Sequence, residues 1–204
     1  MKKFYLLAFA LMQFCCMANA QVIEGTVLKS WDGASGAIEI PANVTEIAEN
    51  CFFEPAEEDP DSWENPSEER SNTNITSVKL NNVKKIGKNA FRGCLNIVAI
   101  DAPNVEIIEE GAFSKCDKLT ALSLPKIKNL GEKAFESCDQ IAKIALGGSL
   151  AKMYGNTFKD CKAVADISVA AGSAYKAVNN AIIDSEKTLV YLAGQAKEIK
   201  LSDS

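Results

Sequence analysis

Apolar residues recur with a period of about 22 residues between Val83 and Val169. Each repeat contains a phenylalanine followed three positions later by a cysteine: Phe91 and Cys94, Phe113 and Cys116, Phe135 and Cys138, Phe158 and Cys161. Successive phenylalanines in this series are 22, 22 and 23 residues apart. So short and regular a period is typical of a solenoid, in which each coil buries its apolar face only against its neighbours.

The polar positions within a repeat predict the elements of each coil. After Cys116, apolar residues follow at Leu119, Leu122 and Leu124, with Ser123 on the opposite face of a strand. Stacked coils would place such strands side by side in a parallel sheet. A short extended piece, such as residues 105–108, is expected before each phenylalanine. The residues just before the phenylalanine, such as 86–91, predict one helical or 3-10 turn. The fold class is therefore a leucine-rich-repeat-like solenoid with a parallel sheet of short strands on one side and short turns on the other.

The same pattern divides the chain into segments. Residues 21–41 are expected to form an N-terminal cap, because residues 36–41 repeat the strand pattern without a preceding phenylalanine. The solenoid is predicted for residues 42–170, with Phe52 as its first interior phenylalanine. Residues 171–204 are expected to form a C-terminal hairpin, turning at residues 184–187, and then to begin a further coil.

An acidic insert interrupts the first coil at residues 54–74. Phe52 and Phe91 are 39 residues apart, which is one period of 22 plus 17 more. The insert has eight acidic residues, three prolines and only Arg70 as a base. Such a composition cannot build a core and predicts a loop that leaves one coil and returns to it. Residues 55–72 are not expected to be needed for closing that coil.

The first 20 residues have the order of a secretory signal peptide: two lysines, an apolar run and the small residues Ala18 and Ala20. Cleavage after Ala20 would leave Gln21 as the mature N-terminus and a secreted or cell-surface protein. A lipoprotein alternative would need a small residue before the modified cysteine, yet Phe14 precedes Cys15. The apolar run is too short to span a membrane, and no later stretch could.

Composition limits the classes of function that this protein can have. The chain has 22 Lys+Arg and 27 Asp+Glu, and loss of the two signal-peptide lysines would move the formal charge from -5 to -7 (20 minus 27). An acidic surface argues against nucleic acid and anionic membranes as partners. The absence of histidine excludes Ser-His-Asp and Cys-His catalysis and any His-ligated metal site. Because no paired carboxylates are evident either, we expect no enzyme activity, cofactor or metal.

Five cysteines would remain after signal cleavage, namely Cys51, Cys94, Cys116, Cys138 and Cys161. In an exported protein they could form disulfides. Four of them, however, occupy one column of successive coils, where neighbouring side chains run parallel about 4.8 Å apart. We favour a column of buried packing thiols. Their spacing lacks the close pairs of a zinc site.

The Ala-Phe pair, the cysteine three residues later and the following strand resemble the BspA-like, or Treponema-type, leucine-rich repeat family over residues 41–169. Residues 173–194 resemble the hairpin segment of these proteins. Tyr154 and Thr157 replace the glycine and alanine of the motif, so the last full coil is expected to turn differently. The resemblance implies surface or secreted proteins that attach to fibronectin, fibrinogen, other host proteins or other bacteria.

The predicted function is that of an exported, non-enzymatic binding protein, adhesin-like and engaging extracellular proteins or cell surfaces. The candidate partner-binding residues are Glu57, Glu58, Asp61 and Trp63 of the insert, and Lys79, Asp101 and Lys143 of the outward strand positions. Calcium could bind the insert acids, but without a calcium-loop spacing a solvated acidic loop is favoured. Trp63 could anchor a partner or fold back onto a coil. The alternative function is a glycan-binding accessory module of a nutrient-capture system, with Trp31, Trp63 and Tyr154 as stacking groups.

Overall fold

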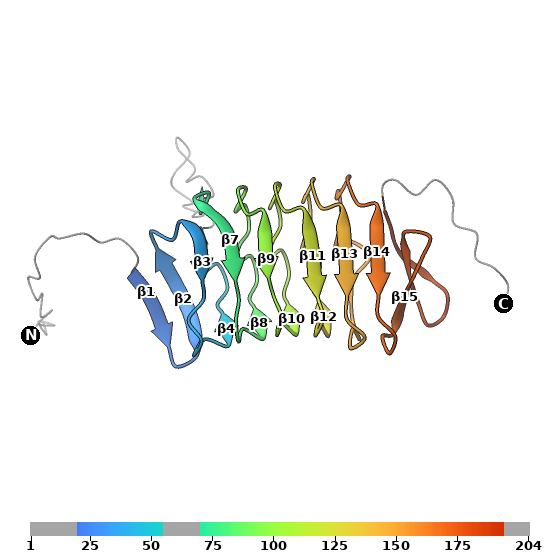
Figure 1. The fold of residues 1–204 in the computed structure, drawn as a ribbon, viewed down its shortest axis with the longest axis horizontal. Coiled ribbons are helices and arrows are strands. Elements are labelled where there is room, and N and C mark those ends of the chain that lie inside the picture. Colours follow the sequence, from blue (N-terminus) through green and yellow to red (C-terminus); the bar gives the residue numbers. More distant parts are fainter. Residues whose placement is uncertain (1–19, 55–69, 194–204) are drawn as a thin grey trace, which may run out of the picture.

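Short parallel strands stack along one long axis to form a solenoid (Figure 1). The structure, a computed structural model, describes residues 20–54 and 70–193. Equivalent strands of consecutive coils pair in parallel. Leu122, for example, lies in register with Ile144 of the next coil. The architecture confirms the solenoid and the parallel sheet predicted from the repeat period.

One side of the solenoid carries the longer strand of each coil. The strands are β3 (Gly36–Glu39), β7 (Ile75–Lys79), β9 (Ala99–Asp101), β11 (Ala121–Leu124), β13 (Lys143–Leu146) and β14 (Asp166–Val169). They form two three-stranded parallel sheets, β3-β7-β9 and β11-β13-β14. The sheets adjoin where the Thr120 amide donates to the Val98 carbonyl at 3.4 Å. We call the outward side of these six strands the strand face.

A second sheet, of mostly two-residue strands, runs along another side. Its order is β1 (Ala20–Glu24), β2 (Val27–Asp32), β4 (Glu46–Ile47), β8 (Lys85–Ile86), β10 (Ile107–Ile108) and β12 (Asn129–Leu130). All neighbours are parallel except β1 and β2, which form an antiparallel hairpin at the N-terminal end. The predicted short extended piece at residues 105–108 includes β10.

Two further antiparallel units complete the described fold. β5 (Phe53–Glu54) pairs with β6 (Arg70–Ser71), on either side of the insert. At the C-terminal end, β15 (Tyr175–Val178), β16 (Ala181–Asp184) and β17 (Leu189–Leu192) form a three-stranded sheet. The predicted hairpin corresponds to β16 and β17, and the structure adds β15. Residues 1–19 of the predicted signal peptide, and the predicted start of a further coil near residue 198, lie outside the described residues.

The predicted helical or 3-10 turn is wrong. No described residue is helical, and the segment before each phenylalanine is a series of tight turns. The physical reason is a residue with positive φ two positions before the phenylalanine, which ends any right-handed helical run. These residues are Asn50 (57°), Asn89 (52°), Gly111 (63°) and Lys133 (52°).

The last full coil turns differently, as its sequence suggested. The equivalent residue there, Asn156, does not adopt a positive φ. Instead, the Thr157 hydroxyl donates to the Gly131 carbonyl at 3.0 Å and accepts from the Tyr154 amide at 3.2 Å. A threonine in place of alanine therefore holds this turn through side-chain hydrogen bonds.

A ladder of phenylalanines forms the core of the solenoid. Ring centroids of Phe52, Phe91, Phe113, Phe135 and Phe158 are 4.7, 5.0, 5.4 and 5.5 Å apart in that order, and the rings lie within 19° of parallel. All five side chains are buried. Trp31 covers the first ring at 6.4 Å, and Tyr191 covers the last at 5.5 Å, both tilted. Side chains from both terminal units thus cap the aromatic ladder.

Replacing Phe113 by alanine should lower the free energy of unfolding by about 3–5 kcal/mol, because it empties a site between two stacked rings. Chemical or thermal unfolding of the purified variant would measure this loss. Leu95→Ala is a suitable control, because that leucine is 39% exposed and its truncation should cost less than about 0.5 kcal/mol. Equal stability of the two variants would contradict the assignment of Phe113 to the core.

Candidate binding surfaces

The strand face is built mainly from small side chains. Its outward residues, in two rows along the axis, are Ala37, Ser77, Ala99, Ala121, Lys143 and Asp166, then Glu39, Lys79, Asp101, Ser123, Ala145 and Ser168. Over the neighbouring strands β3, β7 and β9, the strand face forms a shallow groove of about 380 Å³. Small side chains leave the strand backbones close to the surface, so a partner can approach the sheet closely.

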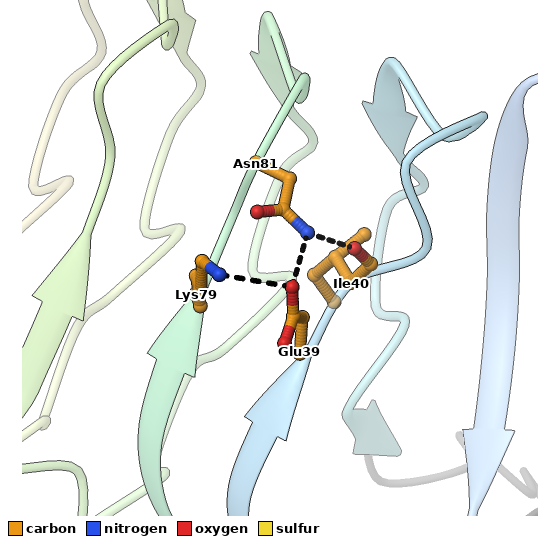
Figure 2. A network of polar contacts seen from close by, with 4 residues as sticks. All are labelled: Glu39, Ile40, Lys79 and Asn81. Carbon is orange, nitrogen blue, oxygen red and sulfur yellow. Dashed lines mark hydrogen bonds and ion pairs between the residues drawn. The ribbon is translucent and has the colours of Figure 1, made fainter.

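Most charges on this face already have a partner within the chain. Lys79 pairs with Glu39 at 3.0 Å, and Lys143 pairs with Asp166 at 2.9 Å. Asn81 donates to the same Glu39 oxygen at 3.0 Å and to the Ile40 carbonyl at 2.8 Å (Figure 2). The Asn81 hydrogen bond, followed by the Lys79 contact, lowers the pKa of Glu39. These pairs neutralise Lys79 and Lys143, two of the three candidate residues on this face.

Asp101 is different. Its side chain is exposed at the end of β9, and it makes no ion pair or hydrogen bond with any other residue of the described part of the chain. It lies in register beside Lys79, whose ammonium group binds Glu39 instead. Asp101 is therefore the charge on the strand face that is available to a cationic group of a partner.

The second sheet, which contains β4, β8, β10 and β12, and the residues beside it also carry paired charges. Lys85 lies between Glu46 and Glu109, at 3.0 and 3.1 Å, and hydrogen bonds to the two carboxylates raise its pKa. Equivalent pairs join neighbouring coils at Lys88–Glu110 and Lys128–Glu106. Within the described residues, no three or more Cys, Asp or Glu side chains are arranged to hold a metal ion. These exposed pairs mainly align adjacent coils, and each contributes little to stability.

The candidate residues of the insert, Glu57, Glu58, Asp61 and Trp63, lie outside the described residues. The structure does show how the insert is attached. Glu54 and Arg70 are directly paired across β5 and β6, so the two ends of the insert are adjacent. Asn72 belongs to the fold, because its amide donates to the Phe52 carbonyl at 3.0 Å and its side chain donates to Ala34 at 2.9 Å. The expectation that residues 55–72 are dispensable is therefore wrong for residues 70–72.

A second groove, of about 450 Å³, lies at the N-terminal end and is called the N-terminal groove. Its lining residues are Ser30–Ala34, Asn50–Glu54 and Ser71–Asn74. Of the three aromatic residues considered for stacking on a glycan, Trp31 lines this groove. Tyr154 lies outside the strands, between β13 and β14, with the Lys152 ammonium 5.0 Å from its ring centroid. Sequence reasoning named Trp31 but missed Asn50 and Asn72, because only the folded coil brings them beside it.

All five described cysteines are buried and free. The thiols of Cys116, Cys138 and Cys161 each donate to the carbonyl of the phenylalanine one coil earlier, at 3.4, 3.1 and 3.0 Å. Burial raises the pKa of Cys51 and of Cys94 to about 12, and that of Cys116 well above its usual range. The column therefore serves packing, and the thiols of Cys51, Cys94 and Cys116 are poor nucleophiles. The hydrogen bond with Cys138 instead lowers the pKa of Cys161, whose side chain is buried as well.

The chain belongs to the BspA type leucine rich repeat family. The model of this repeat region matches residues 67–188 in six copies. Leucine-rich repeat proteins are typically non-enzymatic binding proteins, and the family suggests a protein-binding role at a surface. Within the described residues, no helix is long and apolar enough to cross a membrane.

Solved structures show the same fold at low sequence identity. The T. pallidum leucine rich repeat protein TpLRR is 20% identical, with a TM-score of 0.61 over 77% of this chain and 71% of that one. A leucine-rich repeat protein from Bacteroides ovatus is also 20% identical, with a TM-score of 0.59 over 77% of this chain and 41% of that one. The pneumococcal vaccine antigen PcpA is 19% identical, with a TM-score of 0.55 over 88% and 55%. A search of curated protein sequences gives no match.

All five thiols should react slowly in the native protein at pH 8, because they are buried. In denaturant without a reductant, an Ellman-type assay of the signal-cleaved chain should report five free thiols. The chain after residue 20 supplies its own internal control, since it contains no cysteine other than these five. A denatured count of one or three would reveal disulfides and contradict the packing column.

Proposed function

We propose that this protein is exported and binds an extracellular protein, on a host or on another cell, through the strand face. The observation that carries this proposal is that the outward side chains of the strand face are mostly small and include one unpaired carboxylate, Asp101, whereas the other described charges on that face are paired. A partner with a lysine or arginine at the centre of a smooth surface would fit this arrangement.

Export is supported by the first 20 residues, which have the charge, apolar run and small residues of a signal peptide. The secreted or cell-surface location and cleavage after Ala20 are part of the same proposal. No catalytic role is proposed, since the thiols are buried and the carboxylates outside the strand face mainly pair with lysines of adjacent coils.

A glycan-binding module is the second candidate, and one observation favours it. Trp31 lines a groove rich in hydroxyl and amide side chains, which is the chemistry that holds a sugar. Because this groove is separate from the strand face, the two activities can be tested independently.

Ser123→Arg should weaken binding to immobilised fibronectin or fibrinogen at least tenfold. The arginine would lie on β11, at the position equivalent to Asp101 on β9. Its charge would neutralise the free carboxylate, and its length would prevent a partner from approaching the small side chains closely. Gln140→Arg is the matched control, because it adds the same charge at an exposed position off the strand face and should change affinity less than twofold. Binding by surface plasmon resonance would measure both. The proposal would be contradicted if the two variants bound with equal affinity. It would also be contradicted if the unaltered chain bound neither fibronectin nor fibrinogen.

Replacing residues 55–69 with Asn-Gly should leave unfolding unchanged but weaken the same binding at least tenfold. The reason for stability is that β5 and β6 already hold the ends of the insert in antiparallel register, which a two-residue turn can close. Binding should weaken because we propose that the insert contacts the partner beside the strand face, with Trp63 as an aromatic anchor. Full retention of affinity would assign binding to the strand face alone.

A further inference from the structure

We propose that one coil, residues 94–101, is the centre of the protein-binding surface, where it holds an apolar side chain of the partner beside a lysine or arginine. The inference rests on the proposed function and names the part of the surface that selects the partner. Three exposed side chains of this coil carry it, namely Leu95, Val98 and Asp101. Each of them departs from what neighbouring coils have at the same position.

The first argument is that apolar exposure is concentrated in this coil. Leu95 is 39% exposed and Val98 is 44% exposed. The other large hydrophobic side chains that are exposed in the described part of the chain belong to the terminal units, Val22 to β1 and Leu189 and Leu192 to β17. A single exposed apolar residue is ordinary in a soluble protein. Outside the terminal units, however, both of the described ones lie within four residues of a single coil.

The second argument is that coil packing does not require these apolar residues. The position of Leu95, directly after the cysteine, is charged in the three later coils, which have Asp117, Asp139 and Lys162. The position of Val98 holds threonine or alanine in the other coils, namely Thr76, Thr120, Ala142 and Ala165. Polar or small residues therefore suffice to close the same turn and strand, so the leucine and the valine are available to a partner.

The third argument is that the strand ladder is interrupted beside this coil. β9 belongs to one three-stranded sheet and β11 to the next, whereas β11 and β13 pair over four residues in register. Ile100 of β9 is half-buried, although the equivalent Val78, Leu122 and Ile144 are buried. The coil therefore covers its own apolar residues less completely than its neighbours do, which leaves apolar surface for a partner to cover.

The fourth argument is the charge at the end of the same strand. Asp101 has no cation within the described residues, because the neighbouring Lys79 binds Glu39 at 3.0 Å. Three residues of extended strand place Val98 and Asp101 about 10 Å apart, and the small Ala99 lies between them on the face. A partner segment fits if it carries an apolar side chain and, about 10 Å away, a lysine or arginine that pairs with the carboxylate.

The coil also adjoins the place where the insert returns to the solenoid. The Asn96 side chain donates to the Thr73 carbonyl at 2.7 Å. A side chain in place of Gly93 would collide with Ser71, so the two segments pack closely. A partner bound over this coil would therefore lie beside residues 71–73 as well.

Two substitutions test the apolar contacts. Val98→Thr, which uses the residue of both adjacent coils, and Leu95→Ala should each weaken binding to immobilised fibronectin or fibrinogen at least fivefold, while thermal unfolding stays unchanged. Val22→Thr and Leu192→Ala are the matched controls, because they make the same changes at similarly exposed positions of the terminal units, 46% and 41%. The controls should change affinity less than twofold. Equal affinity of each variant and its control would overturn the proposal.

A random library of twelve-residue peptides tests the chemistry of the partner independently of those two proteins. The library is selected on the immobilised, signal-cleaved chain and counter-selected on the double variant Val98→Thr with Asp101→Asn. Enriched peptides should combine an apolar side chain with a lysine or arginine, and they should bind the parent at least tenfold more tightly than either single variant. The proposal is overturned if no peptide prefers the parent, or if the enriched peptides lack a basic residue.

The two assays separate this inference from the proposed function. If neither fibronectin nor fibrinogen binds the parent, while selected peptides depend on Val98 and Asp101, the coil is supported and the proposed function is contradicted. If fibronectin or fibrinogen binds the parent and Val98→Thr equally, the proposed function stands and the coil is overturned as its centre. Loss of peptide and protein binding in the same variants supports both.

Discussion

A coil of this protein cannot bury its own phenylalanine, and the stacking of the coils along one axis depends on that constraint. Each of the three middle rings, Phe91, Phe113 and Phe135, is covered by the ring of the coil before it and by the ring of the coil after it, with centroids about 5 Å apart. Stability therefore accumulates coil by coil along one axis. The first and last rings lack a neighbouring coil, and the protein solves this with Trp31 from β2 and Tyr191 from β17.

The same constraint separates structure from recognition. The thiols and aliphatic residues needed for stacking point inward, so the outward positions are free to vary in size and charge. On one sheet they pair across coils and align them, as Lys85 does with two glutamates. On the strand face they are mostly small, and Asp101 lacks a partner within the described chain.

The repeat period predicted much of the fold because it reports a physical requirement, namely that equivalent side chains meet in adjacent coils. It located the strand positions and the phenylalanine and cysteine columns. The period alone did not predict the turn before each phenylalanine. Asn50, Asn89 and Gly111 are residue types that favour a positive φ, and only Lys133 gives no such signal. The binding surfaces were less predictable still. That Lys79 is already paired, and that Asn50 and Trp31 share a groove, depends on contacts between residues distant in sequence.

The paired ends of the insert have a consequence for how such a protein can change. Because β5 and β6 fix where the chain leaves the coil and where it returns, the intervening residues can differ in length and composition with little effect on the coil. Lengthening a loop whose ends are already fixed raises its closure entropy only slowly. A different loop between β5 and β6 would therefore leave the rest of the solenoid unchanged.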